Sequence, residues 1–219
     1  MGDSITVGYA DNPTWSVPFE FGFRGGLYAA LINAGHGVQF VGQSPEPWDA
    51  LFGLPVNAPT LDLRQSGQDK HRGYGGITIE ELSRNVAGYI ESDKPDVILL
   101  LIGINGINRR SPRKLNTLVE NIRTALPDGH LVVAQIPPFT SFNQDLWDYN
   151  VYIRDELVPT YAAEGYSVTT VDLYSLFLKD TDDPTSILPA LHSNKINHPS
   201  NVLYNQIAHA WFAGLERIL

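Results

Sequence analysis

A continuous apolar run, Val97 to Ile102, constrains the fold of this chain more than any other feature. Pro95 and Asp96 introduce it, and a run of this length without alternation is typical of a parallel strand that is covered on both faces. Leu131–Ile136 indicates the next buried strand and Val168–Leu173 a further strand. The sequence therefore predicts a parallel sheet whose two faces are both covered by other elements.

Amphipathic segments separate these strands and supply the covering helices. The clearest is Thr78–Ser92, where Thr78 is placed as N-cap and Glu81 as its capping-box partner. The other expected helices cover residues 18–34, Ser111–Ala125, 145–164 and Asn201–Ile218, with a further short strand at Val38–Val41 and a surface excursion between Trp48 and His71. This alternation predicts a three-layer α/β/α sandwich, flavodoxin-like, with a parallel central sheet in a single domain over residues 1–219.

Composition excludes several classes of function. The chain has 219 residues and a formal charge of −9, so its surface repels phosphate backbones and we expect no nucleic-acid partner. It has no cysteine, which removes thiolate nucleophiles and thiolate metal sites. No apolar run is long enough for a membrane span, so no membrane insertion is expected. The N-terminus lacks the pattern of a secretory leader, so we expect a soluble protein, either cytoplasmic or exported after removal of a leader.

In parallel α/β folds, functional residues gather where the strands end. Four short segments stand at such places: Gly2-Asp3-Ser4-Ile5-Thr6, Gly73-Tyr74-Gly75-Gly76, Gly103-Ile104-Asn105 and Asn197-His198-Pro199. In this order and spacing they resemble the blocks of the SGNH (GDSL-type) hydrolase family. Phe23–Leu27, Phe40–Gly42 and His71–Ile79 look most similar to its carbohydrate acetyl-esterase members.

The resemblance implies a set of roles. Ser4 would be the nucleophile and His198 the base that activates it, because a serine hydroxyl needs a neighbouring base at neutral pH. The oxyanion hole would consist of the backbone N–H groups of Ser4 and Gly76 and the side-chain amide of Asn105. Each segment also has a structural interpretation: a turn that caps a helix for Ser4 and Gly76, a turn-forming Asn for Asn105. Gly75 could replace Gly76 as donor, and His71 and His192 remain candidates for the base.

The sequence departs from the family at the residue that orients the histidine. The family has an Asp three positions before the His, where this chain has Lys195, or Asn194 if one residue is inserted. A carboxylate there fixes the tautomer and stabilises the imidazolium. We favour Asn194, or a backbone carbonyl, as the group that orients His198. The alternatives are that one of three nearby acids folds back, or that the protein hydrolyses esters poorly; the three acids are Asp180, Asp182 and Asp183.

A second departure concerns the sheet. In the family a central strand leads into Gly-Asp-Ser, whereas only Met1 precedes Gly2 here, so the first strand appears missing or truncated. An empty central position would leave backbone groups unpaired on both sides. We therefore expect either a frayed N-terminus or another segment in that position.

The resemblance and the loop aromatics together suggest the substrate. Tyr74 and Trp15 are candidates for binding a sugar ring, with further aromatics at Trp48, Phe139, Phe142 and Trp147. We expect a serine esterase that hydrolyses short-chain acyl esters, acetyl above all, on a carbohydrate or another small molecule. The alternatives are a catalytically impaired protein that binds carbohydrates or esters, and a lysophospholipase- or lipase-like acyl hydrolase. No cofactor and no metal are expected, because the ligand spacings of zinc and calcium sites are absent.

Overall fold

The computed structural model describes residues 1–12, 15–18, 22–43, 63, 65–193 and 196–219. A parallel sheet lies at its centre, built from β3 (Val97–Leu100), β4 (His130–Gln135) and β5 (Val168–Asp172) in that order. Val97 pairs with His130, and Leu131 with Val168. These strands are the three apolar runs of the sequence, and the predicted parallel sheet is confirmed.

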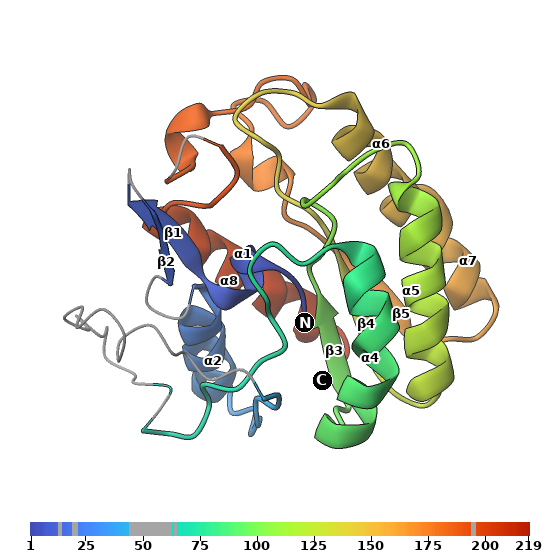
Figure 1. Ribbon diagram of the computed structural model, residues 1–219. Helices are drawn as coiled ribbons and strands as arrows, with labels where there is room; N and C mark the ends of the chain where they lie inside the picture. Colours follow the sequence, from blue (N-terminus) through green and yellow to red (C-terminus); the bar gives the residue numbers. More distant parts are fainter. Residues whose placement is uncertain (13–14, 19–21, 44–62, 64, 194–195) are drawn as a thin grey trace.

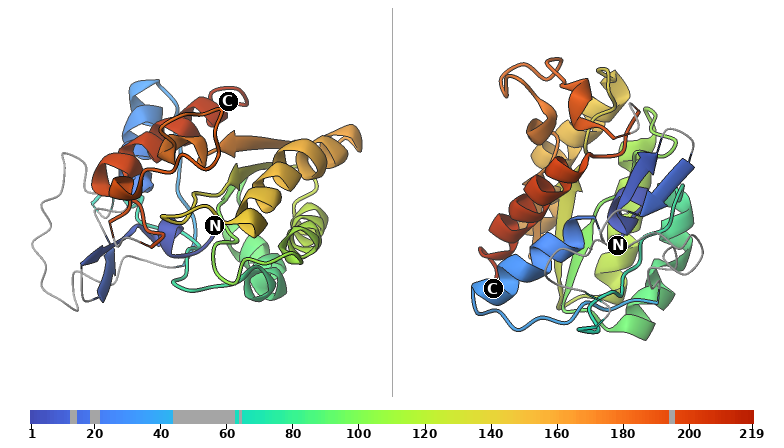
Figure 2. Two further views of the ribbon diagram at one scale, coloured as in Figure 1. Left: turned by 90° about the horizontal axis from the view of Figure 1, so that it is seen from above. Right: turned by 90° about the vertical axis from the view of Figure 1, so that its left-hand side faces the viewer.

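Helices cover both faces of the sheet (Figures 1 and 2). On one face lie α4 (Ile79–Asp93) and α5 (Ser111–Ala125), and on the other lie α2 (Phe23–Asn33) and α8 (Asn201–Leu215). The buried side chains of these helices form one apolar cluster with the strands. The three-layer, flavodoxin-like α/β/α sandwich is therefore confirmed. No helix in the described part of the chain is long and apolar enough to cross a membrane.

The helix expected over residues 18–34 begins later than its apolar spacing indicates. Pro18 instead ends β2 (Trp15–Pro18), which pairs antiparallel with β1 (Tyr9–Asn12). The chain reaches α2 through Gly22, which has a φ of +56° and passes so close to Gly8 that a Cβ would lie 2.5 Å from the Gly8 Cα. Only after this tight crossing can the backbone become helical, so α2 starts at Phe23.

The strand expected at Val38–Val41 does not form, and a side chain supplies the reason. The Gln68 amide donates from Nε2 to the Val38 carbonyl at 3.2 Å, and its Oε1 accepts from the Phe40 N–H at 2.7 Å. One glutamine thus satisfies the backbone groups that a neighbouring strand would otherwise bind. Among the described residues, residues 38–41 have no ladder partner.

The single helix expected over residues 145–164 is divided. The chain forms α6 (Gln144–Tyr152), a π-helical turn (Ile153–Leu157) and α7 (Val158–Ala163). Pro159, in the first turn of α7, has no N–H to donate and its ring displaces the carbonyl four residues earlier. A wider turn directly before the proline accommodates this.

Met1 and Gly2 are hydrogen-bonded in the sheet position where the sequence analysis expected a missing or frayed strand. The Met1 nitrogen donates to the Leu99 carbonyl at 2.7 Å, and the Met1 carbonyl accepts from the Leu101 N–H at 3.0 Å. On its other side, Gly2 forms a parallel bridge to Gly73. Met1 and Gly2 therefore occupy the expected central position, between β3 and the segment that contains Gly73, and Figure 1 shows the N-terminus beside β3.

A groove lies next to Met1, where a residue before Met1 would lengthen the strand. It has a volume of about 390 Å³. Side chains of α2, the 38–41 segment and β3 line it, among them Leu27, Leu31, Phe40, Ile98 and Leu99.

Candidate active site

The serine segment folds into a short helix, α1 (Ser4–Val7), that the sequence analysis did not predict. Asp3 caps it, because its Oδ1 accepts from the Ile5 N–H at 3.0 Å. Gly8 ends it with a φ of +102°, a left-handed conformation that suits glycine, and its N–H donates to the Ser4 carbonyl. The signal was present in the sequence, as an N-cap Asp followed by a glycine one turn later.

Ser4 and His198 meet. The Ser4 Oγ lies 2.8 Å from the His198 Nε2, although 194 positions separate the two residues in the chain. Both side chains are nearly buried, with 4% and 7% of their surface exposed. This distance is within the range in which an imidazole can take a proton from a hydroxyl.

Backbone hydrogen bonds anchor His198 in the loop before α8. Its carbonyl accepts from the Ser193 N–H at 2.8 Å, and the Ser200 N–H donates to the Leu191 carbonyl at 2.8 Å. An antiparallel bridge between His192 and Pro199 closes the same loop. The loop leads into α8, so backbone bonds fix the position from which the imidazole reaches Ser4.

Two further predicted residues lie beside each other. The Asn105 Nδ2 donates to the Ile77 carbonyl at 3.0 Å, which ties Asn105 to the turn that contains Gly76. An amide nitrogen carries two hydrogens, so one of them remains for another acceptor. Gly76 has a φ of +76°, and apart from its chain neighbours no atom of the described residues lies within 4 Å of where its Cβ would be.

The sheet explains why these groups share one edge of the molecule. Gly2 bridges both Gly73 and Leu101. Ser4, Gly76 and Asn105 each follow one of these aligned positions by a few residues. All three therefore follow the carboxyl ends of neighbouring strand positions, the edge of a parallel sheet at which functional residues gather.

Asp3, next to the serine, has an unusual environment. Only 1% of its surface is exposed. Burial raises the pKa of the Asp3 carboxyl to about 7, and its bond from the Ile5 N–H offsets part of that effect. Asp3 therefore exchanges a proton near neutral pH, which sequence reasoning did not anticipate.

Tyr74 turns toward the ion pair of Arg72 and Asp93. Its hydroxyl accepts from the Arg72 Nη1 at 3.2 Å, and its ring lies 5.8 Å from that of Tyr89. Trp15 belongs to β2, and the structure gives no description of its side chain. Asn194 and Lys195 lie outside the described residues, as does Trp48.

The three acids considered for His198 are exposed, and two of them, Asp180 and Asp183, cap their own turn. The Asp180 Oδ1 accepts from the Asp182 N–H, and the Asp183 Oδ1 accepts from Thr185. The His71 Nδ1 accepts from the Gly73 N–H at 2.9 Å, so a backbone group occupies that ring nitrogen.

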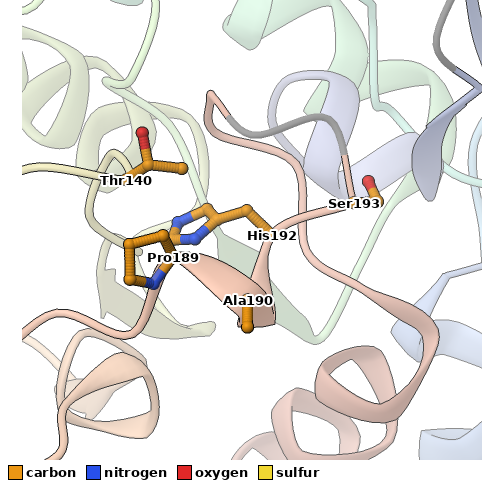
Figure 3. Close-up of a pocket in the computed structure, with 5 residues that line it drawn as sticks. All are labelled: Thr140, Pro189, Ala190, His192 and Ser193. Carbon is orange, nitrogen blue, oxygen red and sulfur yellow. The ribbon is translucent and has the colours of Figure 1, made fainter.

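His192 is a structural residue of the loop. Its Nε2 bonds to the Pro138 carbonyl at 2.9 Å, and burial lowers its pKa. It borders a hollow of about 480 Å³ with Thr140, Pro189, Ala190 and Ser193 (Figure 3). Neither Ser4 nor His198 lines this hollow.

Known proteins share this architecture. A family 3 carbohydrate esterase from Clostridium thermocellum superposes with a TM-score of 0.70 at 25% identity, covering 97% of this chain and 90% of its own. A carbohydrate esterase family 3 structure from Talaromyces cellulolyticus also gives 0.70, at 19% identity, covering 100% and 95%. The fold and these neighbours define the class as an SGNH-type esterase fold.

The sequence comparisons give the family. The model of the GDSL-like lipase/acylhydrolase family matches residues 1–204. A multidomain esterase of Ruminococcus flavefaciens is 27% identical over 245 residues. That match covers the whole of this chain and 28% of the relative, so the chain spans just over a quarter of that protein. The chain belongs to the GDSL-like lipase/acylhydrolase family.

Proposed function

We propose that the protein is a serine esterase that removes short acyl groups, acetyl above all, from a carbohydrate. The observation that carries this proposal is the 2.8 Å distance between the Ser4 Oγ and the His198 Nε2. The Clostridium thermocellum relative is described as a carbohydrate esterase and the Ruminococcus flavefaciens relative as an esterase, which supports the substrate class.

The reaction proceeds through an acyl-enzyme. His198 Nε2 takes the Ser4 proton while Oγ bonds to the ester carbonyl carbon, whose π electrons move onto the carbonyl oxygen. The N–H groups of Ser4 and Gly76 and the Asn105 amide stabilise that oxyanion. When the intermediate collapses, the C–O bond to the alcohol breaks and His198 protonates the leaving oxygen. Water then repeats the sequence on the acyl group and releases the acid.

His198 needs a group that orients its ring, and we propose the Asn194 amide oxygen for this role. An amide can fix the tautomer but stabilises the imidazolium less well than a carboxylate does. Asn194→Asp is therefore expected to raise kcat several-fold on an acetate ester. Lys195→Asp is the matched control for the other register. A kcat that stays the same or falls in Asn194→Asp would argue against this role.

The decisive experiment compares wild type with Ser4→Ala. We expect Ser4→Ala to lower hydrolysis of 4-nitrophenyl acetate, and release of acetate from an acetylated xylo-oligosaccharide, by a factor of about 10³ or more. Ser111→Ala is the control, because Ser111 is also a buried serine at a helix start. A series of longer acyl esters separates an acetyl esterase from a lipase-like hydrolase.

A protein that binds carbohydrates without hydrolysing them is the second candidate, because no carboxylate stands at either position before His198 that the family pattern indicates. Equal rates for wild type and Ser4→Ala would favour it. Binding of the unhydrolysed oligosaccharide by calorimetry would then establish it.

A further inference from the structure

Tyr9 contacts the histidine of the candidate site, and no sequence motif singled it out. It is the first residue of β1 and follows the glycine that ends α1. Its ring stands edge-on to the His198 imidazole, with 5.8 Å between ring centroids and 85° between planes. The segment of residues 4–9 therefore carries both the hydroxyl that faces His198 and an aromatic ring that packs on it.

Two contacts hold the Tyr9 ring in this position. The Tyr204 hydroxyl donates to the Tyr9 carbonyl at 2.6 Å. Tyr204 is buried in α8, the helix that begins directly after the His198 loop. On the other side, Gly75 comes so close that a Cβ there would lie 3.0 Å from the Tyr9 hydroxyl oxygen. The backbone and the ring of Tyr9 are thus both held in place, and the absence of a side chain at Gly75 makes room for the ring.

This confinement limits the motion of the imidazole. A histidine ring that turns away from Ser4 must give up its contact with Tyr9, and edge-to-face aromatic pairs are favourable beyond the area that they bury. Given the proposed function, on which this inference rests, we propose that Tyr9 is a positioning residue that keeps the His198 Nε2 directed at the Ser4 Oγ. The ring acts through His198, so its effect falls on the rate of the chemical step rather than on substrate binding.

The test uses Tyr9→Leu, which removes the ring, and Tyr9→Phe, which keeps the ring without its hydroxyl. We expect Tyr9→Leu to lower kcat on 4-nitrophenyl acetate by about three- to tenfold with KM within twofold of wild type. Tyr9→Phe is expected to stay within twofold in both. The matched control is Tyr28→Leu, because Tyr28 makes a similar edge contact at 5.8 Å, but with Phe40 in place of the histidine.

A second measurement separates positioning from substrate contact. Diethyl 4-nitrophenyl phosphate reacts with an activated serine and carries neither a sugar nor a carboxylic acyl group. The rate at which this compound inactivates the enzyme is expected to fall in Tyr9→Leu by the same factor as kcat. If Tyr9→Leu does not fold, Tyr9→Met, which keeps a long apolar side chain without a ring, takes its place.

Three results would overturn the proposal: a kcat within twofold of wild type in the ring-less variant, a change confined to KM, or a loss in Tyr9→Phe as large as in Tyr9→Leu. Failure of the underlying function gives a different result. In that case wild type and Ser4→Ala hydrolyse the acetate ester equally, whatever stands at position 9.

Discussion

At the scale of single residues, the Ser4 segment combines a hydroxyl that faces His198 with a buried acid. The Asp3 carboxylate caps α1 through the Ile5 N–H, and that bond favours the charged form. Burial opposes it and is the larger effect, so the pKa of Asp3 rises from its ordinary value of 3.8 to about 7. The group that caps α1 therefore reduces the stability of the fold when it ionises.

This environment predicts how stability changes with pH. Between about pH 4 and pH 7 the unfolded chain has lost the Asp3 proton while the folded chain still holds it, so the free energy of unfolding falls as pH rises through that window. Asp3→Asn keeps an oxygen for the Ile5 N–H but cannot ionise. We expect the variant to be more stable than wild type at pH 8, by about 1–3 kcal/mol, and the two to converge near pH 4.

Urea unfolding between pH 4 and pH 8 measures this difference. Asp148→Asn is the control, because Asp148 is exposed on α6 and bonds to Gln144. Parallel stability curves for wild type and Asp3→Asn across the window would show that Asp3 ionises alike in the folded and unfolded chains.

At the scale of elements, the sequence predicted those structures whose signals are local. The capping box of Thr78 and Glu81 and the proline at the start of α5 mark helix ends by side-chain chemistry within one turn. The buried runs of β3, β4 and β5 identify themselves because both faces are covered. Small shifts remain at element ends; α8, for example, ends at Leu215 rather than Ile218.

Most elements that differ from the sequence prediction depend on contacts with residues far away in the chain. No pattern within residues 38–41 shows that the Gln68 side chain takes the place of a neighbouring strand. The divided helix is a different case, because Pro159 is a local signal for the break. The regular apolar spacing of residues 145–164 nevertheless indicated one continuous helix. Helix α1 is too short to be stable alone. Arg24 from α2 donates to the carbonyls of Thr6 and Val7, at its C-terminal end, so a residue outside the motif completes it.

At the scale of the whole molecule, the candidate site joins the two ends of the chain. The resemblance of short blocks identified Ser4 and His198, but only the fold brings their side chains to 2.8 Å. Tyr9 and Asp3 were out of reach of sequence reasoning for the same reason. The edge contact of Tyr9 with His198 and the burial of Asp3 arise from packing between segments that are remote in sequence.

The central sheet position held by Met1 and Gly2 has a consequence for the stability of the whole fold. Along a strand, successive residues present their backbone groups to opposite neighbours. Met1 pairs with Leu99 and Leu101, and Gly2 with Arg72 and Tyr74. A residue attached before Met1 would therefore bind the Lys70 carbonyl and the Arg72 N–H, and the next would bind the Val97 carbonyl and the Leu99 N–H. Both edges border the groove of about 390 Å³.

We therefore expect a chain extended before Met1 by four alternating valines and isoleucines to be more stable than the chain itself. Burial of these side chains contributes about 1.5–3 kcal/mol each, and ordering the backbone offsets about 1–2 kcal/mol per residue, which leaves a net gain of about 2 kcal/mol. For a domain of this size that gain raises Tm by about 4–8 °C. An extension of four Gly and Ser residues is the control, because it adds the same length without apolar side chains.

Hydrogen exchange reports where the extension binds. The valine and isoleucine extension should slow exchange of the Leu99 and Arg72 amides, which face the groove, and leave exchange of the Val133 amide in β4 unchanged. Equal Tm values for the two extensions would mean that the groove does not accept a strand.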